Sequence, residues 1–305
     1  MSATVAVTES TMDRDALAQV LLYSGILPTF SLFSRTVERL SPQLRVINYH
    51  GVPERFRRDF VSQLRRLRDY APILHPNELA DFHAADQFVS GLRLLLTFDD
   101  GLLNHYTVVA DCLEDMGLRG LFFIPVGFVD MAARSRSERV SYFRANIRPH
   151  WDVRHRWADD LLPMSWEMVR ELVERGHAIG SHTWSHQRLG AGLPPSVYRR
   201  EILEAADRIE DEIGAPLVYF GWPFGDPEAY SSEALTLVRR RHRFGFSTFA
   251  LPLRPGGDPH LINRVNLEAG FPTARLRLAL DGFLDVKMYP RWAGVRRRLA
   301  LSEKG

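Results

Sequence analysis

The feature that most constrains the fold of this chain is a regular alternation of short apolar runs with amphipathic, helix-like segments. Apolar residues recur at helical spacing between the runs, as at Phe56, Phe60 and Leu64. This alternation favours a parallel sheet, and about seven units in 305 residues favour a sheet closed into a barrel. The runs that suit buried strands are residues 44–50, 92–98, 120–126, 177–181, 217–222, 244–249 and 261–267.

Polar residues stand at the carboxyl ends of several of these runs, which is where α/β barrels build their sites. His50 ends the first run, and Asp99 and Asp100 follow the second. Where a strand ends, two neighbouring carboxylates can face one pocket, and their crowding then calls for a cation or a proton between them. One carboxylate could bind a metal while the other serves as a base. The alternative is a solvated Asp-Asp-Gly turn.

A second polar stretch, residues 181–186, follows the fourth run. Its histidines, His182 and His186, are four residues apart and share one face if the chain turns helically there. Two solvated or capping histidines would have the same spacing. Joined to a strand-end aspartate, however, they form a His-His-carboxylate set that leaves coordination positions open, as catalytic metal sites do. Nitrogen and oxygen ligands favour zinc, and other divalent transition metals also fit.

Charge and cysteine content exclude several other classes of protein. The 39 basic and 37 acidic residues give a net charge of +2, which offers no basis for a nucleic-acid partner. The single cysteine, Cys112, cannot form an intrachain disulfide. No run approaches the roughly 20 apolar residues of a membrane span. Residues 1–14 are polar and acidic, unlike a signal peptide, so the expected location is the cytoplasm.

The pattern predicts three parts in the chain. Residues 1–43 are expected to form an N-terminal helical extension, whose segment 16–33 either packs on the domain or lies on a membrane surface. Residues 44–290 form the barrel domain, with an irregular, arginine-rich insertion at about 130–162 that covers one end of the fold. Residues 291–305 form a basic tail, which is either a solvated helix face or a contact with the inner face of an anionic membrane.

Three motifs together resemble those of the polysaccharide deacetylases, the NodB-homology proteins of carbohydrate esterase family 4. The resemblance runs from about Leu44 to Phe283 and implies a distorted (β/α)7 barrel. The early segment Asn48-Tyr49-His50-Gly51-Val52 is similar to the branch of poly-N-acetylglucosamine deacetylases. The three motifs are Thr97-Phe98-Asp99-Asp100-Gly101, Gly176-His177-Ala178-Ile179-Gly180-Ser181-His182-Thr183-Trp184-Ser185-His186 and Trp222-Pro223-Phe224-Gly225.

Carried over residue by residue, the resemblance implies a role for each polar residue. Asp100, His182 and His186 would bind one divalent metal, most readily Zn²⁺, with Co²⁺ or Ni²⁺ also suitable. Asp99 would be the general base that takes a proton from the attacking water. His50 would be the general acid that protonates the leaving amine, as in the branch with the early Tyr-His signature. The alternative for His50 is a histidine that caps a strand end.

The third motif departs from the family pattern. Gly221 stands where the family usually has an arginine that orients the catalytic aspartate. Arg264 could replace that arginine from a neighbouring strand end, or it could be an ordinary surface residue. The backbone N–H of Phe224 is expected to stabilise the oxyanion. The rings of Trp222 and Phe224 either stack on a sugar or belong to the core.

The sequence therefore predicts a metal-dependent carbohydrate N-deacetylase. Its expected partner is an N-acetylated sugar in a polymer, an oligosaccharide or a lipid-linked intermediate, and the pattern leaves its oligomeric state open. One alternative is an N-deformylase or other amidase acting on a small or lipid-linked sugar, which a deep, closed pocket beneath the insertion would favour. Another is a weakly active carbohydrate-binding relative, which the missing arginine would favour.

Overall fold

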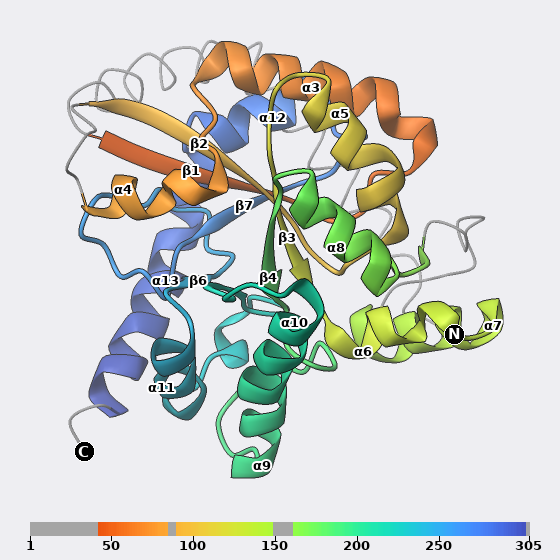
Figure 1. Cartoon of the computed structure of the whole chain (residues 1–305). Coiled ribbons are helices and arrows are strands. Elements are labelled where there is room, and N and C mark those ends of the chain that lie inside the picture. The colour runs from red at the N-terminus through yellow and green to blue at the C-terminus, as the bar shows by residue number, and fades with distance from the viewer. Residues whose placement is uncertain (1–41, 85–89, 149–160, 303–305) are drawn as a thin grey trace, which may run out of the picture.

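The computed structural model describes residues 42–84, 90–148 and 161–302 (Figure 1). In this part of the chain all strands pair in parallel, in the order β6-β5-β4-β3-β2-β1-β7. Each predicted run overlaps one of these strands. The strands are β1 (Pro42–Tyr49), β2 (Gly91–Phe98), β3 (Leu121–Ile124), β4 (Ala178–Ser181), β5 (Tyr219–Gly221), β6 (Phe244–Phe246) and β7 (Arg264–Leu267).

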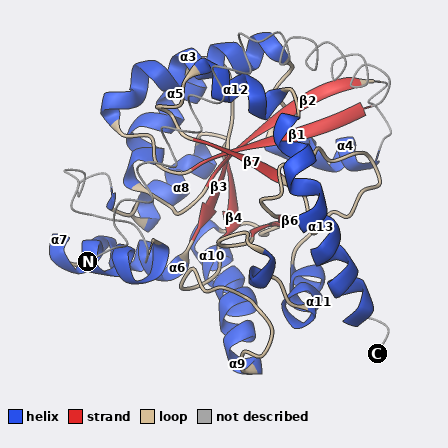
Figure 2. Cartoon of the chain, turned by 180° about the vertical axis from the view of Figure 1, so that it is seen from behind, coloured by secondary structure: helices blue, strands red, loops and turns tan. Residues whose placement is uncertain are grey.

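The two edges of this sheet are joined next to β6 and β7. Phe246 forms a parallel bridge with Ile262, two residues before β7 begins. The Ser247 N–H donates to the Ile262 carbonyl at 2.7 Å, and the Ile262 N–H donates to the Gly245 carbonyl at 2.8 Å. In Figure 2 the strands converge near the middle of the molecule and helices surround them. The distorted (β/α)7 barrel predicted from the sequence is confirmed.

Helices follow the strands and cover the outside of the sheet. π-Helical turns His105–Ala110, Phe143–Ile147 and Arg199–Glu204 adjoin α5, α7 and α10. None of the described helices has the length and apolar character needed to cross a membrane. The helices are α3 (Arg57–Tyr70), α4 (Leu79–Ala84), α5 (Asp111–Glu114), α6 (Val126–Val129), α7 (Arg136–Tyr142), α8 (Trp166–Glu174), α9 (Pro195–Tyr198), α10 (Ala205–Ile213), α11 (Ser232–Arg241), α12 (Thr273–Leu280) and α13 (Phe283–Ser302).

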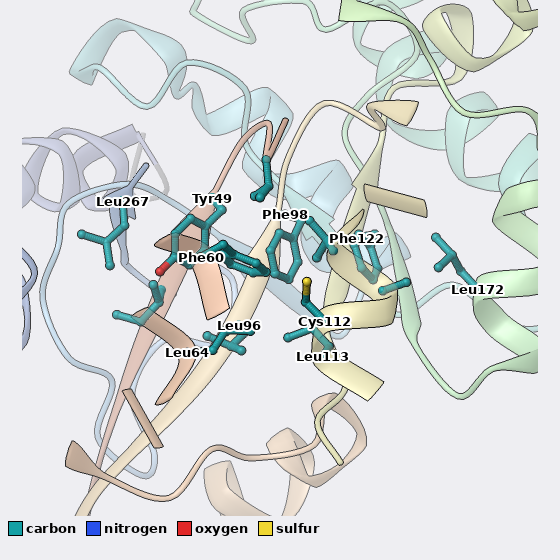
Figure 3. Close-up of a cluster of buried hydrophobic side chains, with 14 of the residues drawn as sticks. Tyr49, Phe60, Leu64, Leu96, Phe98, Cys112, Leu113, Phe122, Leu172 and Leu267 are labelled. Atoms are coloured by element: carbon teal, nitrogen blue, oxygen red, sulfur yellow. The ribbon is translucent and has the colours of Figure 1, made fainter. Parts of the chain in front are cut away.

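A row of buried aromatic rings runs across the first three strands (Figure 3). Tyr49 stacks on Phe98 with ring centroids 5.8 Å apart, and Phe98 stacks on Phe122 at 4.9 Å. Phe60 of α3 meets the edges of this row. Such pairs add about 0.5–1.5 kcal/mol each beyond the burial of their surface. Because Tyr49 and Phe98 are the last residues of β1 and β2, the row fixes the strand ends that lead into His50 and Asp99.

The insertion was predicted to be irregular, but its residues 130–133 and 136–147 are helical, and α7 lies beside α6 at one side of the molecule (Figure 1). A small apolar cluster anchors this segment to the barrel, while residues 149–160 lie outside the described part of the chain. The buried members of the cluster are Leu102, Phe128, Phe143, Ile147 and Leu161.

The two ends of the chain can be compared with their predictions only in part. Nearly all of the predicted extension, residues 1–43, lies outside the described residues. The predicted basic tail continues α13 as far as Ser302. Val295 and Leu299 of this helix are buried in an apolar cluster with Leu235 and Val238 of α11, whereas Arg296 and its two following arginines are exposed. The described part of the tail is therefore a helix with an apolar side that is buried and a basic side that is exposed.

Candidate metal centre and catalytic pocket

The site lies at the carboxyl ends of β1, β2 and β4. Asp99 prolongs β2, since its N–H donates to the Tyr49 carbonyl at 2.9 Å. Asp100 then takes a left-handed backbone conformation with φ of 80°, which is uncommon for residues other than glycine. Consecutive strand residues normally point to opposite faces, and this turn lets both carboxylates face one cavity. Both side chains are nearly fully buried.

Asp100, His182 and His186 come together as one group, whose candidate ligand atoms all lie within 4.8 Å of one another. The Oδ1 atom of Asp100 is 3.7 Å from Nε2 of His182 and 3.5 Å from Nε2 of His186. Backbone carbonyls engage the other ring nitrogens: Gly221 O lies 2.7 Å from His182 Nδ1, and Asn146 O lies 3.2 Å from His186 Nδ1. Hydrogen bonds of this kind direct Nε2 of each ring at a common point.

These residues fit a divalent cation. The Oδ2 atom of Asp100 is buried without a hydrogen-bond partner, which is costly unless a cation compensates it. Burial alone would raise the pKa of Asp100, but Arg148 and the nearby histidines hold that pKa below its ordinary value. Burial also lowers the pKa of His182 and lowers that of His186 to about 3. The group therefore offers one ionised carboxylate and two neutral imidazoles, the protonation states that metal binding requires.

Asp99 is held at both oxygens. Oδ1 accepts from Nη1 of Arg264 at 2.6 Å, and Oδ2 accepts from Nδ2 of Asn48 at 2.9 Å. The Arg264 side chain is fully buried and also donates from Nε to the Ser247 carbonyl at 3.0 Å. Burial alone would raise the pKa of Asp99, but the Arg264 guanidinium and the nearby histidines hold it well below its ordinary range. Asp99 is therefore an oriented, ionised carboxylate.

The structure explains why the usual arginine is missing at position 221. A Cβ atom at Gly221 would lie 2.8 Å from the Phe123 ring and 3.1 Å from Nδ1 of His182. No side chain fits there without moving one of these rings. The guanidinium that contacts Asp99 comes instead from Arg264, the first residue of β7, as the sequence suggested.

His50 and Phe224 line the same cavity, of about 320 Å³. His50 is partly exposed, and its Nδ1 lies 3.3 Å from Oε1 of Glu268. The His50 carbonyl is also 2.6 Å from Nε2 of the buried His105. Phe224 is 36% exposed and has a left-handed backbone conformation with φ of 65°. The centroid of its ring lies 4.7 Å from the centroid of the His186 ring. Both side chains can therefore reach a molecule in the cavity.

Trp222 lines the cavity, but its ring is buried and does not offer a face for stacking. Its side chain is 1% exposed and packs against Phe220 and Tyr230, and its Nε1–H donates to the His260 carbonyl at 3.2 Å. Of the two alternatives for this ring, the structure has the core one. The physical reason is the strand period, because Gly221 faces the histidines and its neighbour Trp222 faces the helices.

The sequence analysis did not identify several residues of the site. The side-chain Nδ2 of Asn48 donates both to Oδ2 of Asp99 and, at 3.1 Å, to Oδ1 of Asn266. Asn266 lies two residues after Arg264, so the strand period could have placed both on one face. Arg148, whose Nε is 3.6 Å from Asp100 Oδ2, directly follows the helical turn Phe143–Ile147, in a segment where the sequence showed no regular pattern.

The fold and site together describe an α/β barrel with a candidate metal centre at its carboxyl edge. The family model for polysaccharide deacetylase matches residues 89–241, half of the chain. The chain therefore belongs to the polysaccharide deacetylase family, and this membership supports a hydrolase of the carbohydrate deacetylase class. No curated protein matches it in sequence.

Three solved structures with the same fold are described here. The Streptococcus pyogenes deacetylase PplD in complex with acetate is 16% identical, with a TM-score of 0.60 over 78% of this chain and 98% of its own. IcaB from Ammonifex degensii is 23% identical and has a TM-score of 0.60, with 80% of this chain and 99% of IcaB covered. The BpsB deacetylase domain from Bordetella bronchiseptica is 19% identical and has a TM-score of 0.56, with 74% of this chain and 96% of that domain covered. At these identities the likeness shows the fold.

Proposed function

We propose that this protein is a metal-dependent hydrolase that removes N-acetyl groups from an amino-sugar-containing glycan or glycolipid intermediate. The observation that carries the proposal is the buried group of Asp100, His182 and His186 next to the ionised, doubly held Asp99. It lies at the edge where barrel enzymes bind their substrates. Membership of the polysaccharide deacetylase family supports the same chemistry.

Asp100, His182 and His186 would hold one divalent metal, with Zn²⁺ best suited to one carboxylate and two imidazoles and Co²⁺ or Ni²⁺ also suitable. Bound there, such an ion supplies Lewis acidity that polarises the amide carbonyl and makes water more acidic. Asp99 is ionised and has both oxygens oriented, so it accepts the proton of the attacking water. Its bonds to Arg264 and Asn48 keep the carboxylate in one orientation during that transfer.

His50 supplies the proton for the leaving amine. Its ring lies at the wall of the cavity, where Glu268 contacts Nδ1 and leaves Nε2 for the substrate. The His105 contact to its carbonyl fixes the backbone at this position. The hydrolysis is complete when the amide C–N bond has broken, water oxygen has joined the acyl carbon, and the amine has taken its proton.

Release of acetate from oligomers of N-acetylglucosamine tests this function. We expect the zinc-loaded wild type to release acetate, and Asp99→Asn to reduce kcat by about 10²–10⁴-fold, the usual contribution of a general base. His50→Gln should lower kcat in the same way. His177→Gln, which changes a buried histidine outside the cavity, is the matched control and should retain activity. Undiminished turnover in Asp99→Asn, or no acetate from any acetylated sugar, would overturn the proposal.

One observation favours a second candidate, an N-deformylase or amidase acting on a small or lipid-linked sugar. Ile147 and Arg148 of the insertion form part of the cavity wall, and a deep, closed pocket at this place would favour the alternative. The chemistry of Asp99 and the candidate metal ligands would be the same. Parallel assays with N-formylated and N-acetylated forms of one sugar separate the candidates, because a deformylase releases formate faster than acetate.

A further inference from the structure

His105 is a fully buried histidine beside the turn that follows β1. It is the first residue of the π-helical turn after β2, and its ring packs against those of Phe98 and Phe122, with centroids 5.8 and 5.7 Å away. An apolar side chain would suit this place, because a buried imidazole costs free energy unless its polar atoms are bonded. The presence of a histidine here is therefore explained by what its ring nitrogens contact.

One ring nitrogen of His105 contacts the backbone of the candidate general acid. Nε2 lies 2.6 Å from the His50 carbonyl, while Nδ1 is buried without a hydrogen-bond partner among the described residues. Burial lowers the pKa of His105 to about 4, so at pH 7 the ring is neutral and carries one N–H. Because a carbonyl oxygen only accepts hydrogen bonds, this N–H is on Nε2 and donates to His50.

The segment after β2 also holds the other side of the turn after β1. The side-chain Oδ1 of Asn104 accepts from the Val52 N–H at 2.9 Å, so two consecutive residues, Asn104 and His105, bond the residues on both sides of Gly51. A Cβ atom at Gly51 would lie 3.2 Å from Leu102, which shows how closely the turn approaches this segment. Side-chain bonds therefore hold the turn beyond the end of the pairing between β1 and β2.

The position of the His50 ring depends on this backbone anchor. The ring contacts Glu268 at 3.3 Å, but the Glu268 side chain is 42% exposed, and a contact of this kind contributes little in water. His50 follows β1, whereas Asp99 and Asp100 follow β2. The bond from His105 joins the strand end that bears the candidate acid to the segment that carries the candidate base and one candidate metal ligand.

We infer that His105 is a positioning residue for the general acid: its bond to the His50 carbonyl sets where the His50 ring stands relative to the reacting amide. The inference rests on the proposed function, in which His50 protonates the leaving amine. His105 does not line the catalytic cavity, so it acts through His50. A reaction whose leaving group departs as a stable anion needs no general acid and should not depend on His105.

The test compares an amide and an ester that carry the same acetyl group, namely N-acetylglucosamine oligomers and 4-nitrophenyl acetate, whose nitrophenolate leaves without a proton. We expect His105→Leu to lower kcat for the amide by about 10- to 100-fold, the cost of misplacing a catalytic group, and to leave kcat for the ester nearly unchanged. His105→Gln, whose side-chain N–H reaches about as far as Nε2, should restore amide hydrolysis. The shorter His105→Asn should not.

Two further variants separate positioning from folding. His177→Leu is the matched control, because His177 is another buried histidine against Phe122 and does not line the catalytic cavity, so its ratio of amide to ester rates should stay that of the wild type. The double variant of His50→Gln and His105→Leu should hydrolyse the amide as slowly as His50→Gln alone. Wild-type amide hydrolysis in His105→Leu, or equal loss of both activities, would overturn the inference and leave the deacetylase proposal standing.

If the wild type releases no acetate from any acetylated sugar, the proposed function fails, and amide hydrogen exchange decides the inference. The Val52 N–H lies in the anchored turn, so His105→Leu should raise its exchange rate by about tenfold, the value of one hydrogen bond, while His105→Gln and His177→Leu should not. Equal exchange rates at Val52 in the wild type and His105→Leu would show that the bond does not hold the turn and would overturn the inference.

Discussion

Replacing Arg264 with methionine should destabilise the protein strongly, although both residues have similar volume. The guanidinium of Arg264 is fully buried and lies 2.6 Å from Oδ1 of Asp99. At an effective dielectric constant of about 20, two unit charges at 2.6 Å attract by about 6 kcal/mol. Desolvation of the two groups cancels much of this gain when both are present.

The cost appears when only one partner is removed. In Arg264→Met the carboxylate of Asp99 stays buried and loses the cation beside it, which typically costs about 3–5 kcal/mol. Asp99→Asn leaves Arg264 in the same position and should also be destabilising. In the double variant neither charge is left buried without its partner. The double variant should therefore lose about 2 kcal/mol less free energy of unfolding than the sum of the two single variants.

Urea unfolding at pH 7 in the presence of a chelator measures these differences without any contribution from bound metal. Arg170→Met is the control, since Arg170 forms an exposed ion pair with Glu212 and should cost less than about 1 kcal/mol. A loss below about 1 kcal/mol in Arg264→Met, or single losses that add without coupling, would refute the reasoning about this buried pair.

Three further predictions concern other parts of the structure. Burial lowers the pKa of His177 from about 6.5 in the unfolded chain to about 4 in the folded protein. Between pH 6.5 and pH 4, His177 is therefore protonated in the unfolded chain but not in the folded protein. His177 therefore contributes about 2 kcal/mol to the stability that is lost as pH falls from 7 to 5 in urea titrations, beside other buried histidines such as His105 and His242, and His177→Gln should remove this contribution. Gly221→Ala should cost about 1–3 kcal/mol, because its Cβ would lie 2.8 Å from Phe123, whereas Gly294→Ala, with open space around it, should not. Zinc at about 100 times its Kd should stabilise the wild type by about 2.7 kcal/mol in thermal unfolding and should not stabilise Asp100→Asn.

Each of these has a result that would contradict it. If the free energy of unfolding of wild type and His177→Gln falls equally between pH 7 and pH 5, His177 does not contribute to the loss of stability at low pH. If Gly221→Ala is as stable as the wild type, the Phe123 ring moves aside without a free-energy cost. Equal zinc stabilisation of Asp100→Asn and wild type would place the bound ion elsewhere.

The fold could be predicted because its signals are local. Strand-length apolar runs alternate with helical periodicity, and parallel strands bring their carboxyl ends to one edge. This rule is enough to bring Asp99, Asp100, His182 and His186 towards one place although more than 80 residues separate them. It does not place Arg264, which is the first residue of β7 and comes near Asp99 because β7 pairs with β1 and β1 with β2, a strand order that the sequence pattern does not specify.

The contacts that depend on side-chain direction could not be predicted in this way. Arg148 contacts Asp100 from the end of a helical segment that a small apolar cluster positions, and the sequence pattern predicted no helix there. When both faces of a strand are apolar, the sequence does not show which face turns towards the site, so it could not show that the Trp222 ring is buried although Trp222 lines the cavity. Its burial follows from packing against α11 and neighbouring residues, which the sequence pattern does not specify.

Elemental analysis of the purified protein would show whether Asp100, His182 and His186 form a metal centre. We expect a single divalent ion per chain in the wild type and in the control His177→Gln, and loss of that ion in both Asp100→Asn and His186→Asn. Wild-type protein that binds no ion after equilibration with zinc or cobalt would contradict the proposed hydrolytic mechanism. Full occupancy in both ligand variants would contradict the assignment of the site.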